Sequence, residues 1–194
     1  SLVTYGSTKG VTLEMELDSE KRGSIELKDL GMLSAQRRKL ASTLEETGGV
    51  VLIASPPQHG MTTTLYTLLQ RHDPYTDSIV TLEDQVSFAM EGVNHEVLEP
   101  GTSTEQISER LGAILRRDPQ VVMLSKLADN QSARVIAGAA KEVRFYAGVR
   151  ANDWYQALMI WLKAVGDMRS GAKGISAIVS QRLVRRLCPT CRIA

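Results

Sequence analysis

Apolar residues along this chain gather in short continuous runs, and the segments between these runs repeat apolar side chains every three or four positions. The runs Val50–Ala54 and Val121–Leu124 are typical of strands that are covered on both faces. The spacing between the runs is typical of amphipathic helices. Because strands and helices alternate, we predict an α/β fold whose sheet is mostly parallel and carries helices on both faces. The predicted strands are Val50–Ala54, Ser78–Leu82, Val121–Leu124 and Arg144–Val149.

Helix starts are predicted from residues that can cap a helix. The candidates are Ser34, Thr102 with Glu105 as a capping box, Asp129, and Asn152 or Asp153. A further helix is predicted over Met61–His72. The last helix is expected to bury Trp154 and Trp161 on one face. The segment Ile175–Leu187 is apolar enough for either a helix or a strand.

The first part of the chain differs from the rest. Val11–Leu17 alternates apolar and polar residues, which predicts a half-buried strand. A segment this short cannot bury a core of its own. We therefore assign residues 1–30 to the end of a preceding domain plus a linker, and residues 31–194 to one α/β domain.

Composition narrows the class of protein. The 194 residues are 43% hydrophobic and 23% charged, with a formal net charge of +1. These values are typical of a globular protein and give no reason to expect nucleic acid or an anionic membrane as a partner. No apolar run reaches the roughly 20 residues of a transmembrane helix, and the start of the chain lacks a signal-peptide pattern. We therefore expect a cytoplasmic location.

The segment after the first apolar run has the layout of a phosphate-binding loop. Such loops follow a strand, open a helix and read G-x-x-x-x-G-K-[ST], whereas Ser55–Thr62 reads SPPQHGMT. The second glycine and the hydroxyl are present, but Met61 stands at the lysine position, and a thioether cannot neutralise a phosphate. A glutamine at position 58 carries a steric cost if the backbone there is left-handed. The candidate phosphate-binding residues are Ser55, Gln58, His59, Gly60, Met61, Thr62 and Thr63.

Four further stretches, in order along the chain, carry a resemblance to a known family. They are Thr62–Tyr66 (TTTLY), Ile79–Asp84 (IVTLED), Leu115–Pro119 (LRRDP) and Gln181–Cys191 (QRLVRRLCPTC). From about Leu2 to Cys191 the chain resembles the type II secretion and type IV pilus assembly ATPases. The resemblance implies a RecA-like P-loop NTPase domain that binds ATP and Mg²⁺, assembles as a hexamer and works with secretion or pilus assembly proteins, peripheral to the inner membrane.

The departures from the family pattern fall where the chemistry is expected. Lys126 replaces the family's Walker B glutamate, and both histidines of the family's later motifs are missing. Glu83 remains as the candidate catalytic base. Phosphoryl transfer depends on positioning and on stabilising negative charge with Mg²⁺, and Lys126 is expected to repel that ion. We therefore predict a pseudo-ATPase that binds no cofactor and has a structural or regulatory role, alone or assembled with active relatives.

Alternatives remain open at several of these residues. Lys126 or Arg150 could replace the missing lysine in an unconventional ATPase. For Lys126, the strand end before it and the strand end before the loop are expected to be neighbours. Thr62 and Thr63 could be ordinary helix residues. Glu83 could be a solvated carboxylate, and His59 could simply be exposed.

The two cysteines end the recognisable pattern. Cys188 and Cys191 have the C-x2-C spacing of half a tetrahedral zinc site. Two thiolates do not close such a site. We therefore expect reduced, metal-free cysteines, with zinc only if a second C-x2-C pair follows Ala194 in a longer protein.

Overall fold

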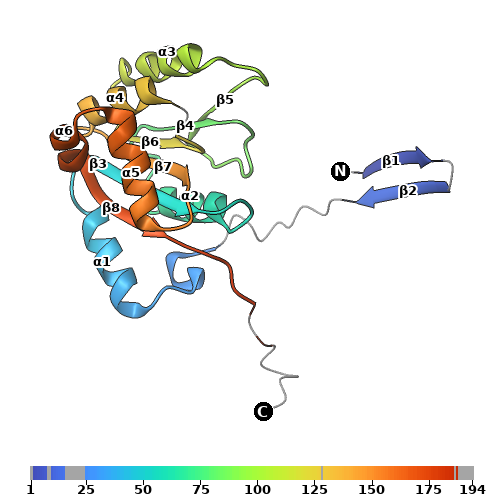
Figure 1. The fold of residues 1–194 in the computed structure, drawn as a ribbon. Coiled ribbons are helices and arrows are strands. Elements are labelled where there is room, and N and C mark those ends of the chain that lie inside the picture. Colours follow the sequence, from blue (N-terminus) through green and yellow to red (C-terminus); the bar gives the residue numbers. More distant parts are fainter. Residues whose placement is uncertain (1, 8–9, 16–24, 128, 186, 188–194) are drawn as a thin grey trace.

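The computed structural model describes residues 2–7, 10–15, 25–127, 129–185 and 187. Its strands include β3 (Gly49–Ser55), β4 (Ile79–Glu83), β5 (Asn94–Val97), β6 (Val121–Leu124), β7 (Arg144–Arg150) and β8 (Ile175–Ser180). These six form one parallel sheet in the order β5-β4-β6-β7-β3-β8 (Figure 1). The predicted α/β fold with a parallel sheet is confirmed, and the segment from residue 175 to residue 180 is a strand.

A separate hairpin precedes the sheet. Its strands are β1 (Leu2–Ser7) and β2 (Gly10–Met15), which pair antiparallel with Leu2 opposite Met15. The predicted strand in this part of the chain is therefore present over its first five residues, and its last two lie outside the described residues. Within the described residues these two strands pair only with each other.

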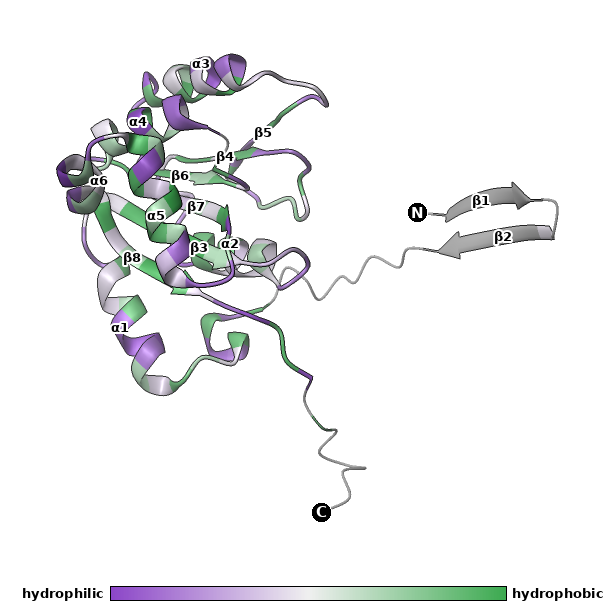
Figure 2. Ribbon diagram, viewed as in Figure 1, coloured by the Kyte–Doolittle hydropathy of each residue, from purple (hydrophilic) through white to green (hydrophobic). Residues whose placement is uncertain are grey.

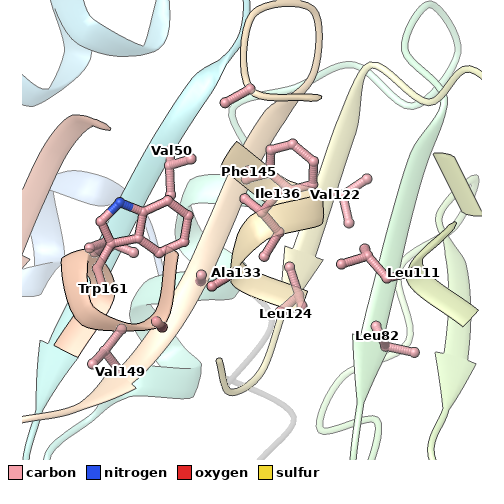
Figure 3. Close-up of a cluster of buried hydrophobic side chains, with 14 of the residues drawn as sticks. Val50, Leu82, Leu111, Val122, Leu124, Ala133, Ile136, Phe145, Val149 and Trp161 are labelled. Atoms are coloured by element: carbon pink, nitrogen blue, oxygen red, sulfur yellow. The ribbon is translucent and has the colours of Figure 1, made fainter. Parts of the chain in front are cut away.

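Helices cover both faces of the sheet. Because successive side chains of a strand point to opposite faces, Val50 and Leu52 lie in one buried cluster while Val51 and Ile53 lie in the other. The first cluster includes residues from α3, α4 and α5 (Figure 3), and the second includes residues from the 3-10 turn η2, α1 and α2. Figure 2 shows hydrophobic residues along β3 and β8 between these layers. The elements are η2 (Leu27–Leu30), α1 (Ser34–Leu44), α2 (Met61–Leu69), α3 (Thr104–Leu115), α4 (Asn130–Ala139), α5 (Trp154–Val165) and α6 (Met168–Gly174).

Two of the predicted helix caps are confirmed. Asp129 Oδ1 accepts a hydrogen bond from the backbone N–H of Ser132 at 2.8 Å. Asp153 Oδ1 accepts one from the backbone N–H of Gln156 at 2.7 Å. Both carboxylates therefore begin their helices as predicted.

The other two caps were predicted wrongly. Ser34 is the first helical residue rather than the cap. The capping box of α3 is formed by Ser103 and Gln106, one position later than predicted, because Thr102 Oγ1 instead donates to the carbonyl of Glu99 at 2.6 Å. Spacing alone does not distinguish neighbouring residues that can all cap.

The two tryptophans have different environments. Trp161 is fully buried, and its Nε1 donates to the carbonyl of Gly171 at 3.0 Å. Trp154 is 57% exposed and packs edge-on against Tyr155, which contradicts its predicted burial. Trp154 is the first residue of α5, so no preceding turn of that helix lies beneath its side chain.

No helix among the described residues has both the length and the apolar character needed to cross a bilayer.

Candidate functional site

The phosphate-like loop lies at the carboxyl end of β3. Ser55 is buried, with its Oγ donating to the carbonyl of Pro56, and α2 begins directly after Gly60. Gln58 has a φ of 62° and Gly60 has a φ of 81°. The loop thus requires left-handed backbone at two positions, and the steric cost predicted at Gln58 is present, on the order of 1 kcal/mol.

Met61 belongs to the core. It is 7% exposed, and a Cβ added to Gly148 would lie 2.5 Å from its Sδ and closer still to the carbonyl oxygen of Ser125. The thioether therefore fills the space over β7, towards the end of β6. Thr62 beside it is exposed, and Thr63 is half-buried within the first turn of α2.

The strand that precedes Lys126 is not a neighbour of the strand that precedes the loop, so the predicted adjacency of these two strand ends is wrong. β7 separates β6 from β3 in the sheet. Lys126 Nζ instead lies 3.9 Å from Asp84 Oδ2, in a pair whose side chains are 54% and 66% exposed. The predicted placement fails because strand order is not evident from the spacing of motifs along the chain.

Arg150 is the candidate cation that the sheet does place beside the loop. It is the last residue of β7 and the Cα partner of Ser55 on β3. Its side chain is exposed.

Glu83 is a buried carboxylate with hydrogen-bond partners, which contradicts its interpretation as a solvated side chain. It is 1% exposed, and Tyr66 OH lies 2.9 Å from Oε1 and 2.7 Å from Oε2. Burial and the hydrogen bond to Glu83 raise the pKa of Tyr66, which keeps the phenol protonated as a donor. The carboxylate is therefore held by a neutral donor.

His95 completes this cluster. The backbone N–H of Met90 donates to its Nε2 at 3.1 Å, so the ring hydrogen is on Nδ1. Nδ1 lies 2.9 Å from Thr81 Oγ1 and 3.3 Å from Glu83 Oε1. Tyr66 and His95 were not predicted as partners of Glu83. They lie 17 and 12 positions from it, and residues so far apart in sequence carry no local signal of contact.

His59 is also engaged, although an exposed histidine was predicted. It is half-buried, and its Nδ1 accepts a hydrogen bond from the backbone N–H of Leu183 at 3.0 Å. Gln181 Nε2 donates to the carbonyl of His59 at 2.9 Å. The segment after β8 therefore contacts the loop directly.

A groove of about 800 Å³ runs from the loop along β8, with η2 and α1 on its opposite side. Its walls combine apolar side chains with a few polar ones. The residues at the loop end are His59, Gly60, Thr63 and Thr64, and the charged residues along it are Asp29, Lys39 and Arg182.

Metal ligands can be assessed only in part. Cys188 and Cys191 lie outside the described residues. Within the described part of the chain, no group of three or more histidine, cysteine or acidic side chains is placed to hold a metal ion.

Known protein sequences resemble this chain over nearly its whole length. Residues 4–194 match the family described as "Type II/IV secretion system protein". The Pseudomonas aeruginosa type II secretion system protein HxcR is 30% identical over 98% of this chain and 40% of its own length. The Vibrio cholerae type II secretion system ATPase E is 26% identical over 97% of this chain and 38% of its own length. The chain thus spans about 40% of the length of these relatives.

Solved structures show the same fold. The Legionella pneumophila ATPase DotB matches with a TM-score of 0.71 and 14% identity over 82% of this chain and 46% of its own length. The pilus retraction motor PilT with bound ADP matches with a TM-score of 0.69 and 20% identity over 93% of this chain and 54% of its own length. The predicted P-loop NTPase fold is therefore confirmed. By its sequence match over nearly its whole length, this chain belongs to the type II/IV secretion system protein family.

Proposed function

We propose that this chain is a catalytically inactive ATPase-like domain that serves protein secretion or pilus assembly as a structural or regulatory module. The observation that carries the proposal is Met61: a buried thioether stands where a phosphate-binding loop has its lysine.

The absence of the lysine lowers the affinity of the loop for phosphate. A hydrogen bond to a charged group contributes about 1.5–3 kcal/mol, which corresponds to roughly 10–150-fold in affinity. Gln58, in the same loop, is uncharged and supplies no compensating charge.

The groups that follow β6 and end β4 argue against catalysis. Lys126 carries a positive charge beside Asp84. Glu83 is buried and already accepts from Tyr66. Both carboxylates that could bind a hydrated Mg²⁺ thus already have partners, Lys126 for Asp84 and Tyr66 for Glu83, so we derive no reaction step from them.

The partners follow from the family. We expect secretion or pilus assembly proteins, including active ATPase relatives with which the domain forms oligomers, on the cytoplasmic side of the membrane. The proposed role is that of the whole protein that contains this domain.

The test measures ATP binding and phosphate release in the presence of Mg²⁺. We expect no saturation of the wild-type chain below about 1 mM ATP, where binding energies fall to ~4 kcal/mol, and no phosphate release. Met61→Lys should bind ATP about 10–150-fold more tightly than the uncharged control Met61→Leu. Turnover by the wild-type chain would contradict the proposal.

A second candidate is an unconventional ATPase that uses Arg150. The pairing of Arg150 with Ser55 favours this residue over Lys126. If this candidate is correct, the wild-type chain binds ATP, Arg150→Ala abolishes binding, and the exposed control Arg185→Ala leaves it intact. Equal binding by both variants excludes the candidate.

A further inference from the structure

The segment after β8 makes two hydrogen bonds to His59 of the phosphate-like loop and two more to the elements that flank the loop. The backbone N–H of Gln181 donates to the carbonyl of Ala54 at 3.0 Å, which continues the pairing of β8 with β3. The Gln181 side chain then reaches His59 and Thr64, while the backbone N–H of Leu183 reaches the His59 ring. Residues more than 110 positions away thus contact the loop where α2 begins.

Both ends of the Gln181 amide are occupied. Its Nε2 donates to the carbonyl of His59 at 2.9 Å, and its Oε1 accepts from Thr64 Oγ1 at 2.6 Å. A carbonyl oxygen can only accept, so the group that faces His59 must be the NH2. The orientation of the side-chain amide is therefore fixed by its partners.

This contact fixes a peptide group of the loop. In a trans peptide the C=O and the following N–H point in opposite directions. A His59 carbonyl directed at Gln181 therefore turns the N–H of Gly60 away from Gln181. Phosphate-binding loops act through backbone N–H groups directed at the anion, so the orientation of this peptide determines where one of these groups points.

Gly60 is packed closely at this point. A Cβ added there would lie 3.3 Å from Gln181 Nε2 and 3.5 Å from Leu183 Cδ2, and the residue has a φ of 81°. The absence of a side chain allows the segment after β8 to approach the loop.

We propose that Gln181 is a positioning residue of the phosphate-like loop, which holds the His59–Gly60 peptide in one orientation by donating to the His59 carbonyl. Leu183 supports it by anchoring the His59 ring through Nδ1. The inference rests on the proposed function in one respect. Because the loop has no lysine, its backbone N–H groups are the donors that remain for contact with an anion.

The test compares Gln181→Glu with the wild-type chain by amide hydrogen exchange without nucleotide. Glutamate keeps the size of the side chain and an acceptor for Thr64, but it places an oxygen against the His59 carbonyl. The N–H of Thr64 donates to the carbonyl of Gly60 at 3.1 Å, in the peptide that directly follows His59–Gly60, so its exchange reports on the end of the loop that Gln181 contacts. We expect Thr64 to exchange about 10-fold faster, the equivalent of one lost hydrogen bond.

Two controls separate positioning from general loosening. Leu68, in the same helix, should keep its exchange rate, and Gln85→Glu on the surface should change neither residue. Gln181→Ala, which removes both the donor to His59 and the acceptor from Thr64 without adding a charge, should also accelerate Thr64. Unchanged exchange at Thr64 in both variants, or equal acceleration at Leu68, would overturn the proposal. Because no nucleotide is involved, failure here is distinct from ATP turnover, which would overturn the proposed function instead.

Discussion

The phenolic oxygen of Tyr66 lies within hydrogen-bond distance of both carboxylate oxygens of Glu83, at 2.9 Å and 2.7 Å. Tyr66 is on α2, directly after the phosphate-like loop, and Glu83 is the last residue of β4. The bond therefore links the helix of one motif to the strand of the other. The main role of a carboxylate that is buried and hydrogen-bonded in this way is to stabilise the fold.

Removal of the Tyr66 hydroxyl should destabilise the protein. Tyr66→Phe leaves the Glu83 carboxylate buried without its phenolic donor, and we expect the free energy of unfolding to fall by about 1–3 kcal/mol. Urea denaturation measures the change. Tyr75→Phe is the matched control, because Tyr75 is 85% exposed. Equal stability of the two variants would contradict the role assigned to the Tyr66–Glu83 bond.

His72 should make stability depend on pH. Burial lowers the pKa of His72 from its usual value of 6.5, despite the opposing charge of Asp77. The unfolded chain therefore takes up the proton more readily, so stability is present above pH 6.5 and is lost as the pH falls through the lower folded pKa.

The measurement is urea denaturation of the wild-type chain and His72→Gln at several pH values between 7.5 and 5. One proton contributes at most about 1.4 kcal/mol per pH unit, so the wild-type slope should exceed that of the variant by up to this amount. Identical slopes would show that His72 does not carry the effect.

Two glycines should respond to alanine in opposite directions. At Gly148 the new Cβ would meet Met61 Sδ at 2.5 Å and the backbone of Ser125, which cannot move away easily. We expect Gly148→Ala to lower the free energy of unfolding by about 1–3 kcal/mol. Gly138, in α4, has nothing within 4 Å of such a Cβ, and Gly138→Ala should stabilise by roughly 0.5–1 kcal/mol. Thermal unfolding of both variants tests the pair.

The tryptophans provide a third comparison. Trp161 is fully buried and Trp154 is 57% exposed. Trp161→Ala should cost about 3–5 kcal/mol, whereas Trp154→Ala should stay within about 0.5 kcal/mol of the wild type. A large loss in the Trp154 variant would show that the surface position carries more packing than its exposure indicates.

The pattern of apolar residues was sufficient to predict the central strands but not the elements at the edges of the domain. β3 and β6 are covered on both faces, so they appear as continuous apolar runs. β5 (NHEV) lies at the edge of the sheet and is largely polar, and α6 contains two glycines in seven residues. Neither element carries the periodicity on which such predictions depend.

The candidate site was predictable as a loop but not as a set of contacts. The strand–loop–helix layout is local, and the structure contains it. The separation of the strands before Lys126 and before the loop depends on the order of the strands, and the partners of Glu83 and His59 come from segments far apart in sequence. Such contacts depend on how distant chain segments pack, which the spacing of residues along the chain does not show.

The backbone of Gly148 has one further consequence. Met61 on one side and the carbonyl of Ser125 on the other both occupy the room that a side chain at Gly148 would need. We therefore expect that a displacement at the first turn of α2 would press on Ser125, next to Lys126. The small size of Gly148 lets the start of α2 and the end of β6 come this close.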